Sequence, residues 1–359
     1  MKKAPPKFIF NLFLNMIKKF EKRRLKKYPA FLLTQFYLVG HIHIQLIKAA
    51  LELNIPNILA SNNSMSLEEL HNATKTNKSA LQRFLRALNA MQIVKIGKKT
   101  GKYSIGKTGK IILKNNQNEG LYNLSMIIGT EWYDSLKNIT KAVKTGDYIL
   151  PEQKYKSYWD YLKNNITSSN YFNNSMEELT NSITPAILAD YKFNNFTHIV
   201  DVGGGKGLLL SAILNKYPHL KVTLFEDKKL ISIVKKNKIF DERCTFIEGD
   251  FFKSIPKGGD CYILKYIIHD WNDEEAKIIL NNCNKAMKKG DTLLLIELTI
   301  DEVEFNWYRL YLDILLLSSI GGKERTIKQF KNLLKDTGFN YTKVIRTRSF
   351  MSIIEAKKI

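Results

Sequence analysis

The chain has 359 residues, 44% hydrophobic and 25% charged, which is more than one ordinary domain and enough for packed cores. Its formal net charge of +22 raises the question of an anionic partner. Residues 1–28 hold ten Lys and Arg against one Glu, and the remaining excess is scattered along the chain. The scatter argues against a specific nucleic-acid surface. The basic arm 1–28 is compatible with an anionic membrane surface or with docking on a partner subunit.

The cysteines and the apolar stretches of the sequence indicate the cellular compartment in which the protein is expected. The three cysteines, Cys244, Cys261 and Cys283, show no metal-ligand spacing and no disulfide framework, so a reducing compartment is expected. The apolar stretch 8–17 is shorter than the roughly 20 residues that span a bilayer, and no small-residue cleavage site follows it. We therefore expect a cytoplasmic protein, with peripheral membrane contact through the arm left open.

The first part of the chain predicts helices followed by a hairpin. Apolar spacing is helical over residues 32–59, where Pro56 interrupts the run near its end. Ser66 is placed to cap the next helix, and residues 79–91 predict another. A hairpin is predicted over 93–105. The order gives a winged-helix outline, which is compatible with binding DNA or with pairing subunits.

From residue 191 the pattern changes to alternating strands and helices, which predicts a mostly parallel sheet covered on both faces. Parallel strands are expected at 198–203, 221–226, 244–249, 260–265 and 292–298. Two last strands, 339–346 and 349–356, are joined too tightly for a crossover and predict an antiparallel terminal hairpin. The prediction is an α/β, Rossmann-like, seven-stranded domain.

The stretch 198–207 predicts a cofactor-binding turn. A buried strand ends in Asp201 and Val202, and Gly203, Gly205 and Gly207 form the turn into a helix. Glycines let the backbone bend sharply and approach a ligand, whose anionic end the amides at the helix start would hold. Gly207 comes one residue too early for a dinucleotide fingerprint.

Acidic and aromatic residues end the next two strands. Glu226, about twenty residues on, is placed to accept both hydroxyls of an adenosine ribose. Asp250 could hydrogen-bond the edge of an adenine and Phe251 could cover its face. Ribose, adenine and a charged tail on successive strand ends describe S-adenosyl-L-methionine.

Five motifs in order make the chain resemble the plant caffeate and bacterial small-molecule O-methyltransferases, a class I S-adenosyl-L-methionine-dependent family, over about residues 30–356. The matches are Val200-Asp-Val-Gly-Gly-Gly-Lys-Gly, Gly249-Asp-Phe-Phe, Tyr262-Ile-Leu-Lys-Tyr-Ile-Ile-His-Asp-Trp, Ile296-Glu-Leu and Gly321-Gly-Lys-Glu-Arg-Thr. One departure is Asp227-Lys-Lys, where the family usually continues with an apolar residue and proline.

The resemblance implies the roles of the site residues. His269 is the general base, and Glu297 and Glu324 are the acids that orient it. Lys265 lies at the cofactor, although a strand-end lysine can equally reach solvent.

Six residues are candidates for the acceptor pocket. Phe172 and Met176 are implied to lie near the acceptor. Trp132, Trp271 and Tyr311 are aromatic residues that could stack on a flat acceptor or belong to the core. Asp270 could cap a turn or touch the substrate. No carboxylate cluster at the acceptor site supports a metal-dependent mechanism.

The predicted organisation is a basic arm 1–28, a winged-helix-like dimerisation domain 29–115, a helical bridge 116–190 lining the acceptor pocket, and a catalytic domain 191–359. The predicted function is a homodimeric, metal-independent O-methyltransferase. It would act on a small aromatic or polyketide-like metabolite and leave S-adenosyl-L-homocysteine. Alternatives with the same fold are N- or C-methylation or a non-methylating relative. An alternative of another class is a cofactor-sensing winged-helix DNA-binding regulator.

Overall fold

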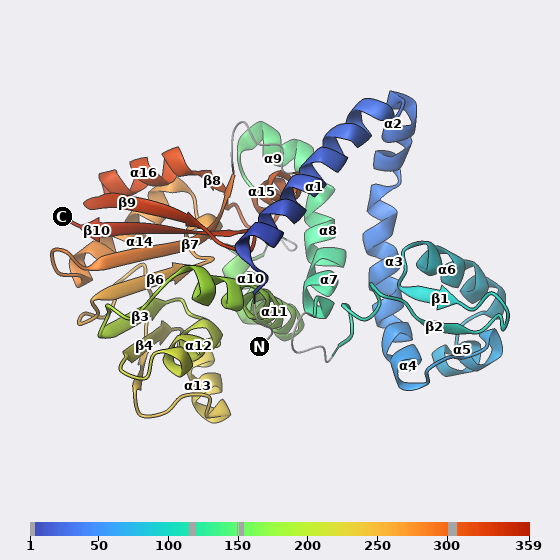
Figure 1. Cartoon of the computed structure of the whole chain (residues 1–359), viewed down its shortest axis with the longest axis horizontal. Coiled ribbons are helices and arrows are strands. Elements are labelled where there is room, and N and C mark those ends of the chain that lie inside the picture. The colour runs from blue at the N-terminus through green and yellow to red at the C-terminus, as the bar shows by residue number, and fades with distance from the viewer. Residues whose placement is uncertain (1–3, 115–119, 149, 151–153, 301–306) are drawn as a thin grey trace. The chain divides into compact units, whose positions relative to one another are not determined.

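The computed structural model describes residues 4–114, 120–148, 150, 154–300 and 307–359, which form two compact units that alternate along the sequence. The first, here the sheet unit, comprises residues 1–19, 135–158 and 180–359. The second, the helical unit, comprises residues 20–134 and 159–179. Figure 1 shows the helices and strands of each. The domain boundaries expected after residues 28, 115 and 190 stay predictions.

The helical unit is built from helices and one hairpin. Four of its helices cross the boundary between the units, namely α1, α8, α10 and α11. The helices are α1 (Lys7–Lys27), α2 (Ala30–Leu38), α3 (Gly40–Glu52), α4 (Ile55–Ser61), α5 (Leu67–Thr74), α6 (Lys78–Ala90), α7 (Tyr122–Gly129), α8 (Glu131–Leu136), α10 (Tyr158–Asn164) and α11 (Ile166–Asp190). The expected hairpin is present as β1 (Val94–Ile96) antiparallel to β2 (Tyr103–Ile105). Ser66 caps α5 as predicted, in a capping box with Glu69.

The prediction of one helical run over 32–59, interrupted at Pro56, is wrong about where the helix is interrupted. The helix ends at Leu38 and again at Glu52, and Asn54 then adopts a left-handed φ of 56°. Pro56 does not interrupt a helix; it lies in the first turn of α4, where its missing N–H has no helical acceptor to lose.

Residues 30–52 include a helical stretch that is long and apolar enough, by length and composition alone, to cross a membrane, with none of the scored window buried. The helical path changes at Val39, where α2 ends and α3 begins. Core helices of soluble proteins and N-terminal signal sequences pass the same test, so we assign no membrane span to it.

The sheet unit contains the predicted mostly parallel sheet. Its strands are β3 (His198–Val202), β4 (Lys221–Glu226), β5 (Cys244–Glu248), β6 (Cys261–Lys265), β7 (Thr292–Ile300), β8 (Arg325–Thr326), β9 (Phe339–Arg346) and β10 (Met351–Lys358). Seven of them follow the order β5-β4-β3-β6-β7-β10-β9. The terminal hairpin is antiparallel, as predicted. The eighth, β8, is a two-residue strand parallel to the end of β7.

Helices cover both faces of this sheet because buried residues alternate along its strands. On one face Ile199 and Ile263 pack with α11, α12 (Leu208–Lys216) and α13 (Lys228–Asn237). On the other, Val200 and Tyr262 pack with α14 (Asp273–Ala286) and α16 (Ile327–Asp336). The unit also contains α9 (Ile139–Thr145), the one-turn helix η1 (Ile268–Asp270) and α15 (Trp307–Ser319). Because helices cover both faces of the sheet, ligands are expected to bind at the carboxyl edge of its parallel strands.

Candidate active site

The glycine turn after β3 has the backbone conformation that its sequence predicts. Gly203, Gly205 and Gly207 all have positive φ, which a side chain would strain. At Gly205 no heavy atom lies within 4 Å of the place a Cβ would occupy, so the turn opens there toward free space. The Gly205 amide donates to Oε2 of Glu226 at 2.9 Å. The turn therefore presents bare backbone at the edge where parallel-sheet proteins bind ligands.

Asp201 lies beneath this turn as a buried carboxylate. Its side chain is fully buried, and neither oxygen has a hydrogen-bond partner among the described residues. Burial raises the pKa of Asp201 to about 6, and the positive charge of Lys265 opposes that shift. A buried carboxylate without partners is costly unless something binds it. The arrangement suits a cationic ligand group.

Two further strand ends contribute the predicted cofactor side chains. Glu226 accepts from the amides of Gly205 and Asp227, and burial raises its pKa to about 7 against those hydrogen bonds. Asp250 remains half-exposed and accepts from the Phe252 amide at 2.9 Å. These residues end neighbouring strands β4 and β5, so the structure brings them to one edge as predicted from the strand order.

Phe251 and Lys265 complete the predicted cofactor set. The Phe251 ring is half-buried, and one of its carbons lies 3.6 Å from the place of a Gly203 Cβ. Lys265 ends β6 and is buried, with Nζ donating to Thr180 Oγ1 at 3.0 Å. Burial lowers the pKa of Lys265, and Asp201 opposes that change first among its neighbours. Lys265 therefore points into the unit instead of reaching solvent.

His269 lies on η1, just past the end of β6, and carboxylates contact both of its ring nitrogens. Nδ1 is 3.0 Å from Oε1 of Glu324, and Nε2 is 3.3 Å from Oδ1 of Asp270. Burial alone would lower the pKa of His269, but the negative charges of Asp270, Glu324 and Glu297 outweigh it and raise the pKa to about 10. The imidazole is thus held in a fixed orientation and made more basic.

Glu297 acts on this turn through the backbone. Its Oε1 accepts from the amides of Ile267 and Ile268 at 3.2 and 2.9 Å, whereas Oε2 has no hydrogen-bond partner among the described residues. Burial raises the pKa of Glu297 to about 7, and the charge of His269 opposes this shift. Glu297 therefore holds the residues before His269 and contributes charge.

The predicted acceptor residues divide between the two units. Trp132 is buried on α8, and Phe172 and Met176 are half-buried on α11, all in the helical unit. Trp159 packs edge-on against Phe172 at 5.4 Å between ring centroids. The acceptor role of this set stays a prediction.

The other predicted acceptor residues belong to the sheet unit. Trp271 packs its indole against Phe252 at 4.6 Å between ring centroids and also contacts Phe251, on the predicted adenine side. Tyr311 is 60% exposed on α15 beside Trp307. Asp270, the remaining residue of the set, contacts Nε2 of His269 at 3.3 Å. Across the described residues, no group of three or more His, Cys, Asp or Glu side chains is arranged to hold a metal ion.

Sequence reasoning assigned no role to three residues that support the His269 turn. Asp313 accepts from the Glu324 amide at 2.7 Å, Arg325 donates to carbonyls of the turn, and Tyr266 has φ of 55° next to Lys265. The sequence signal that could have identified Arg325 is its position directly after Glu324 in the Gly321-Gly-Lys-Glu-Arg-Thr motif. An arginine beside a predicted active-site acid is a candidate for a buried ion pair.

Comparisons with known protein families match both parts of the chain. A family model described as an O-methyltransferase domain matches residues 133–340, and one described as an O-methyltransferase dimerisation domain matches residues 36–115.

Known O-methyltransferases align with this chain over nearly their whole length. The phenazine O-methyltransferase PhzM of Lysobacter antibioticus is 30% identical over 90% of this chain and 94% of its own. The 3'-hydroxy-N-methyl-(S)-coclaurine 4'-O-methyltransferase of Coptis japonica is 31% identical, over 89% of this chain and 93% of its own. The crystal structure of LaPhzM has a TM-score of 0.85 at 29% identity and covers 92% of this chain and 100% of that one. The mitomycin 7-O-methyltransferase MmcR has a TM-score of 0.84 at 26% identity, with coverage of 92% and 98%.

Proposed function

The chain belongs to the O-methyltransferase family, and on that premise we propose that it moves a methyl group from S-adenosyl-L-methionine to a hydroxyl of a small aromatic or polyketide-like metabolite, with His269 as the general base. The observation that carries the proposal is the His269 cluster at the same sheet edge as the glycine turn and Asp201. Neither feature alone would distinguish a methyltransferase from another nucleotide-binding enzyme.

The residues at the sheet edge fit this donor. S-adenosyl-L-methionine is a cation, and the two unpartnered carboxylate oxygens of Asp201 offer a buried anionic partner for its charged tail. Glu226 would hold the ribose, and Asp250 and Phe251 the adenine. When bound, the donor supplies an electrophilic methyl group on a sulfonium centre. Two structural neighbours were solved with S-adenosyl-L-methionine or "SAH", at 23% and 21% identity.

Proton transfer would involve the Nε2 atom of His269. Glu324 on Nδ1 fixes the ring, so the acceptor hydroxyl would give its proton to Nε2, which Asp270 contacts at 3.3 Å in this structure. Its raised pKa of about 10 brings the imidazole close to a phenol, whose pKa is also roughly 10. Matched pKa values make proton sharing between acceptor and base nearly free of cost. The rest of the acceleration would come from alignment with the donor.

We also propose that the chain is a homodimer joined through its N-terminal domain. The dimerisation-domain match supports pairing. In addition, α2 exposes large apolar side chains, with Phe31 70% and Leu38 67% exposed. A partner subunit would bury this surface, which is large for a monomer. A cytoplasmic, reducing setting is part of the proposal and is supported by three buried, unpaired cysteines.

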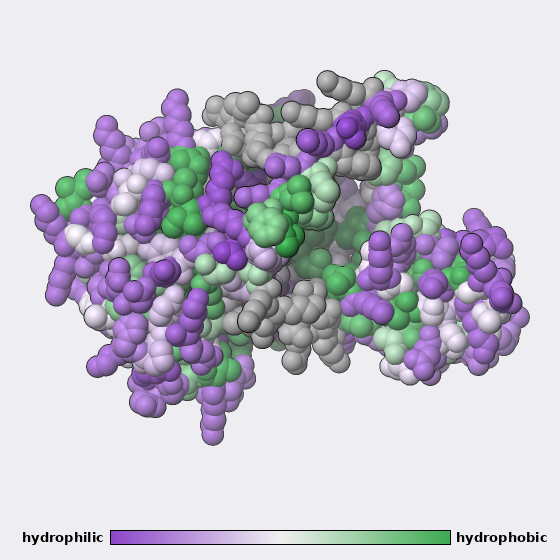
Figure 2. All heavy atoms as spheres, in the orientation of Figure 1, coloured by the Kyte–Doolittle hydropathy of each residue, from purple (hydrophilic) through white to green (hydrophobic). Residues whose placement is uncertain are grey.

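We further propose that the arm 1–28 contacts a membrane surface. Hydrophobic side chains gather near the start of α1 and hydrophilic ones further along (Figure 2). Phe8, Leu12 and Met16, spaced by one helical turn each, are 72%, 57% and 54% exposed. An apolar stripe joined to a strongly basic segment is typical of helices that rest on anionic lipid.

The deciding experiment identifies the acceptor and the atom that is methylated. Purified protein would be incubated with metabolite extracts, then with panels of phenols and anilines, using isotopically labelled S-adenosyl-L-methionine and mass spectrometry. Transfer to oxygen supports the proposal. Transfer to nitrogen alone would overturn it, and the fold does not exclude this, because an N,N-8-amino-8-demethyl-D-riboflavin dimethyltransferase shares it at 22% identity. A specific, salt-dependent shift of duplex DNA without any methyl transfer would favour the regulator instead.

A further inference from the structure

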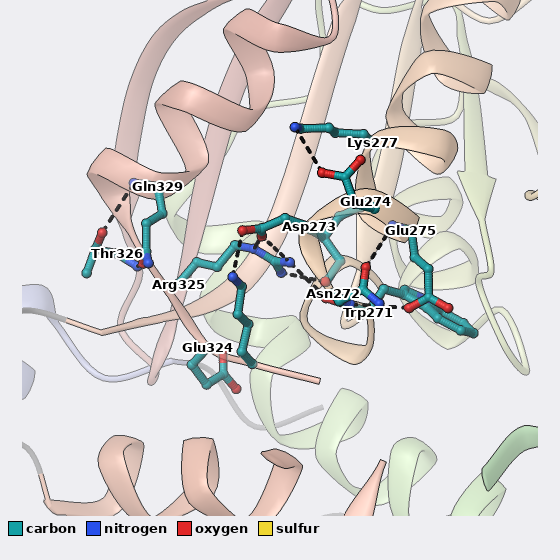
Figure 3. A network of polar contacts seen from close by, with 12 residues as sticks. Trp271, Asn272, Asp273, Glu274, Glu275, Lys277, Glu324, Arg325, Thr326 and Gln329 are labelled. Atoms are coloured by element: carbon teal, nitrogen blue, oxygen red, sulfur yellow. Dashed lines mark hydrogen bonds and ion pairs between the residues drawn. The ribbon is translucent and has the colours of Figure 1, made fainter. Parts of the chain in front are cut away.

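Arg325 is a fully buried arginine whose side chain contacts the segment that carries His269. Its Nη1 donates to the carbonyl of Ile268 and its Nη2 to the carbonyl of Trp271, each at 2.7 Å. Nε and Nη2 both reach Oδ1 of Asp273, at 3.0 and 2.9 Å. Figure 3 shows the guanidinium between Asp273 and the Trp271 backbone. All acceptors lie within six consecutive residues around His269.

The rest of the 322–325 segment contacts the same turn. The Lys323 amide donates to the His269 carbonyl at 2.8 Å, and Lys323 Nζ reaches Asp273 Oδ2 at 2.7 Å. A Cβ on Gly322 would lie 2.2 Å from the His269 carbonyl oxygen, so only glycine allows this approach. Glu324, one residue before Arg325, contacts the imidazole itself. Consecutive residues of the 322–325 segment thus hold both the backbone and the side chain of His269.

The turn needs such support because it makes few hydrogen bonds of its own. It is a three-residue 3-10 helix, η1, in which the Asp270 amide donates to the Ile267 carbonyl at 3.2 Å and the Trp271 amide to the Ile268 carbonyl at 3.4 Å. On the amide side, Glu297 accepts from Ile267 and Ile268. On the carbonyl side, Arg325 donates on both flanks of His269. The two buried charges therefore fix the peptide units before and after the base from opposite directions.

We propose that Arg325 is a positioning residue that sets the orientation of the His269 imidazole by holding the carbonyls of Ile268 and Trp271. The inference rests on the proposed function in one respect, that His269 is the base. A lysine could not replace the arginine, because a single ammonium group cannot span two carbonyls and a carboxylate in one plane. Displacing the turn by a fraction of an ångström would leave the donor site intact and misalign the base.

The test compares R325K and R325M with R348K in the full-length protein. Arg348 is a matched control, because it is an arginine of the same unit that pairs with a carboxylate away from the turn, Asp190, at 3.0 Å. We expect R325K and R325M to lower kcat by about 10- to 100-fold with KM for S-adenosyl-L-methionine changed by less than about twofold. R348K should leave both constants unchanged. The milder D273N removes the other half of the ion pair and should give a smaller loss of kcat.

A second readout does not depend on catalysis. NMR titration of the His269 imidazole reports its distance from the charged groups that face it, namely Asp270, Glu324 and Glu297, and from the Tyr266 ring. We expect R325K and D273N to move this titration toward lower pH and R348K to leave it in place. If the titration and kcat of both Arg325 variants match the wild type, the inference is wrong. Thermal midpoints lowered equally in R325K and R348K, with kcat lost in both, would also overturn it.

These outcomes separate the inference from the proposed function. If H269A keeps full turnover while R325K still moves the imidazole titration, His269 is not the base but Arg325 positions it. If H269A loses turnover while the Arg325 variants behave as wild type, the base assignment stands and the positioning role fails.

Discussion

The Nδ1 atom of His269 lies 3.0 Å from Oε1 of Glu324, although 55 residues separate them in the chain. The contact leaves Nε2 as the nitrogen that can exchange a proton with an acceptor. It also adds negative charge next to the imidazole. Orientation and basicity of the base therefore depend on one carboxylate carried by the short segment before α16.

Replacing Glu324 with Gln should reduce kcat through the loss of orientation. The amide still fills the site but no longer orients a charged imidazole, so we expect a loss of about 10²-fold in kcat. E355Q is the matched control, because Glu355 is a buried carboxylate on β10 that accepts from the Tyr191 hydroxyl at 2.7 Å. Steady-state kinetics of both variants would check this. Equal kcat for E324Q and wild type would contradict the orienting role.

The rate should rise with pH above neutrality. With a pKa of about 10, His269 is protonated at pH 7 in the free enzyme, and a neutral phenol must lose one proton before reaction. The reactive form therefore increases about tenfold per pH unit below the pKa, so kcat/KM should climb from pH 7 to 9. E324Q removes a carboxylate that raises the pKa, so its plateau should begin at lower pH. A flat profile between pH 7 and 9 would show that no such proton is lost.

Removing the imidazole should abolish most turnover without affecting donor binding. For H269A we expect kcat to fall by about 10² to 10⁴. Calorimetry should give an unchanged Kd for S-adenosyl-L-methionine, because no cofactor contact is assigned to His269. H219A is the control, since His219 contacts the Phe196 carbonyl at the exposed surface. Undiminished turnover by H269A would refute its role as base.

Donor affinity should depend on Asp201 and on pH. Asp201 has a pKa of about 6, so below that value a proton competes with a cation for its oxygens. Affinity for S-adenosyl-L-methionine should therefore rise from pH 5 to 7 and then level off. D201N should weaken binding by about 10- to 100-fold and flatten the pH dependence. D260N is the control and should retain the wild-type Kd and pH dependence, because Asp260 precedes β6 and accepts from the His198 amide at the start of β3, the end opposite the glycine turn. Calorimetric Kd values across this range test the prediction. Glu226 in the same site has a pKa of about 7, so the result that would exclude Asp201 as a titrating group is a pH dependence of D201N identical to that of the wild type.

The basic arm should bind anionic membranes. Full-length protein should sediment with vesicles containing phosphatidylserine, and the loss of residues 1–28 should abolish this. Replacing Phe8, Leu12 and Met16 with Ser tests the apolar stripe while keeping the charge. Neutral phosphatidylcholine vesicles are the control for charge. If full-length and truncated proteins sediment equally, the arm has another partner, such as a second subunit.

Much of the site could be predicted from the sequence because the relevant information is local. A glycine turn, an acid about twenty residues later and an acid beside an aromatic each report on one strand end. The rule that parallel strands end at one edge brings Asp201, Glu226 and Asp250 together without knowledge of packing. The same rule places His269 after β6. These predictions follow from periodicity and chain order, which tertiary packing does not alter.

Other features could be decided only by the folded chain. Packing selects the side-chain rotamers, and these cannot be read from the sequence. The rotamers decide whether Lys265 points inward and whether Trp271 faces Phe252. They also decide whether Glu297 reaches the imidazole or the preceding amides. Arg325 has no local signal for its acceptors, since carbonyls are present at every residue. Its role emerges because β8 pairs with the end of β7 and brings residues 322–325 against η1. Sequence determines which groups reach the sheet edge, whereas long-range packing determines which atom each group faces.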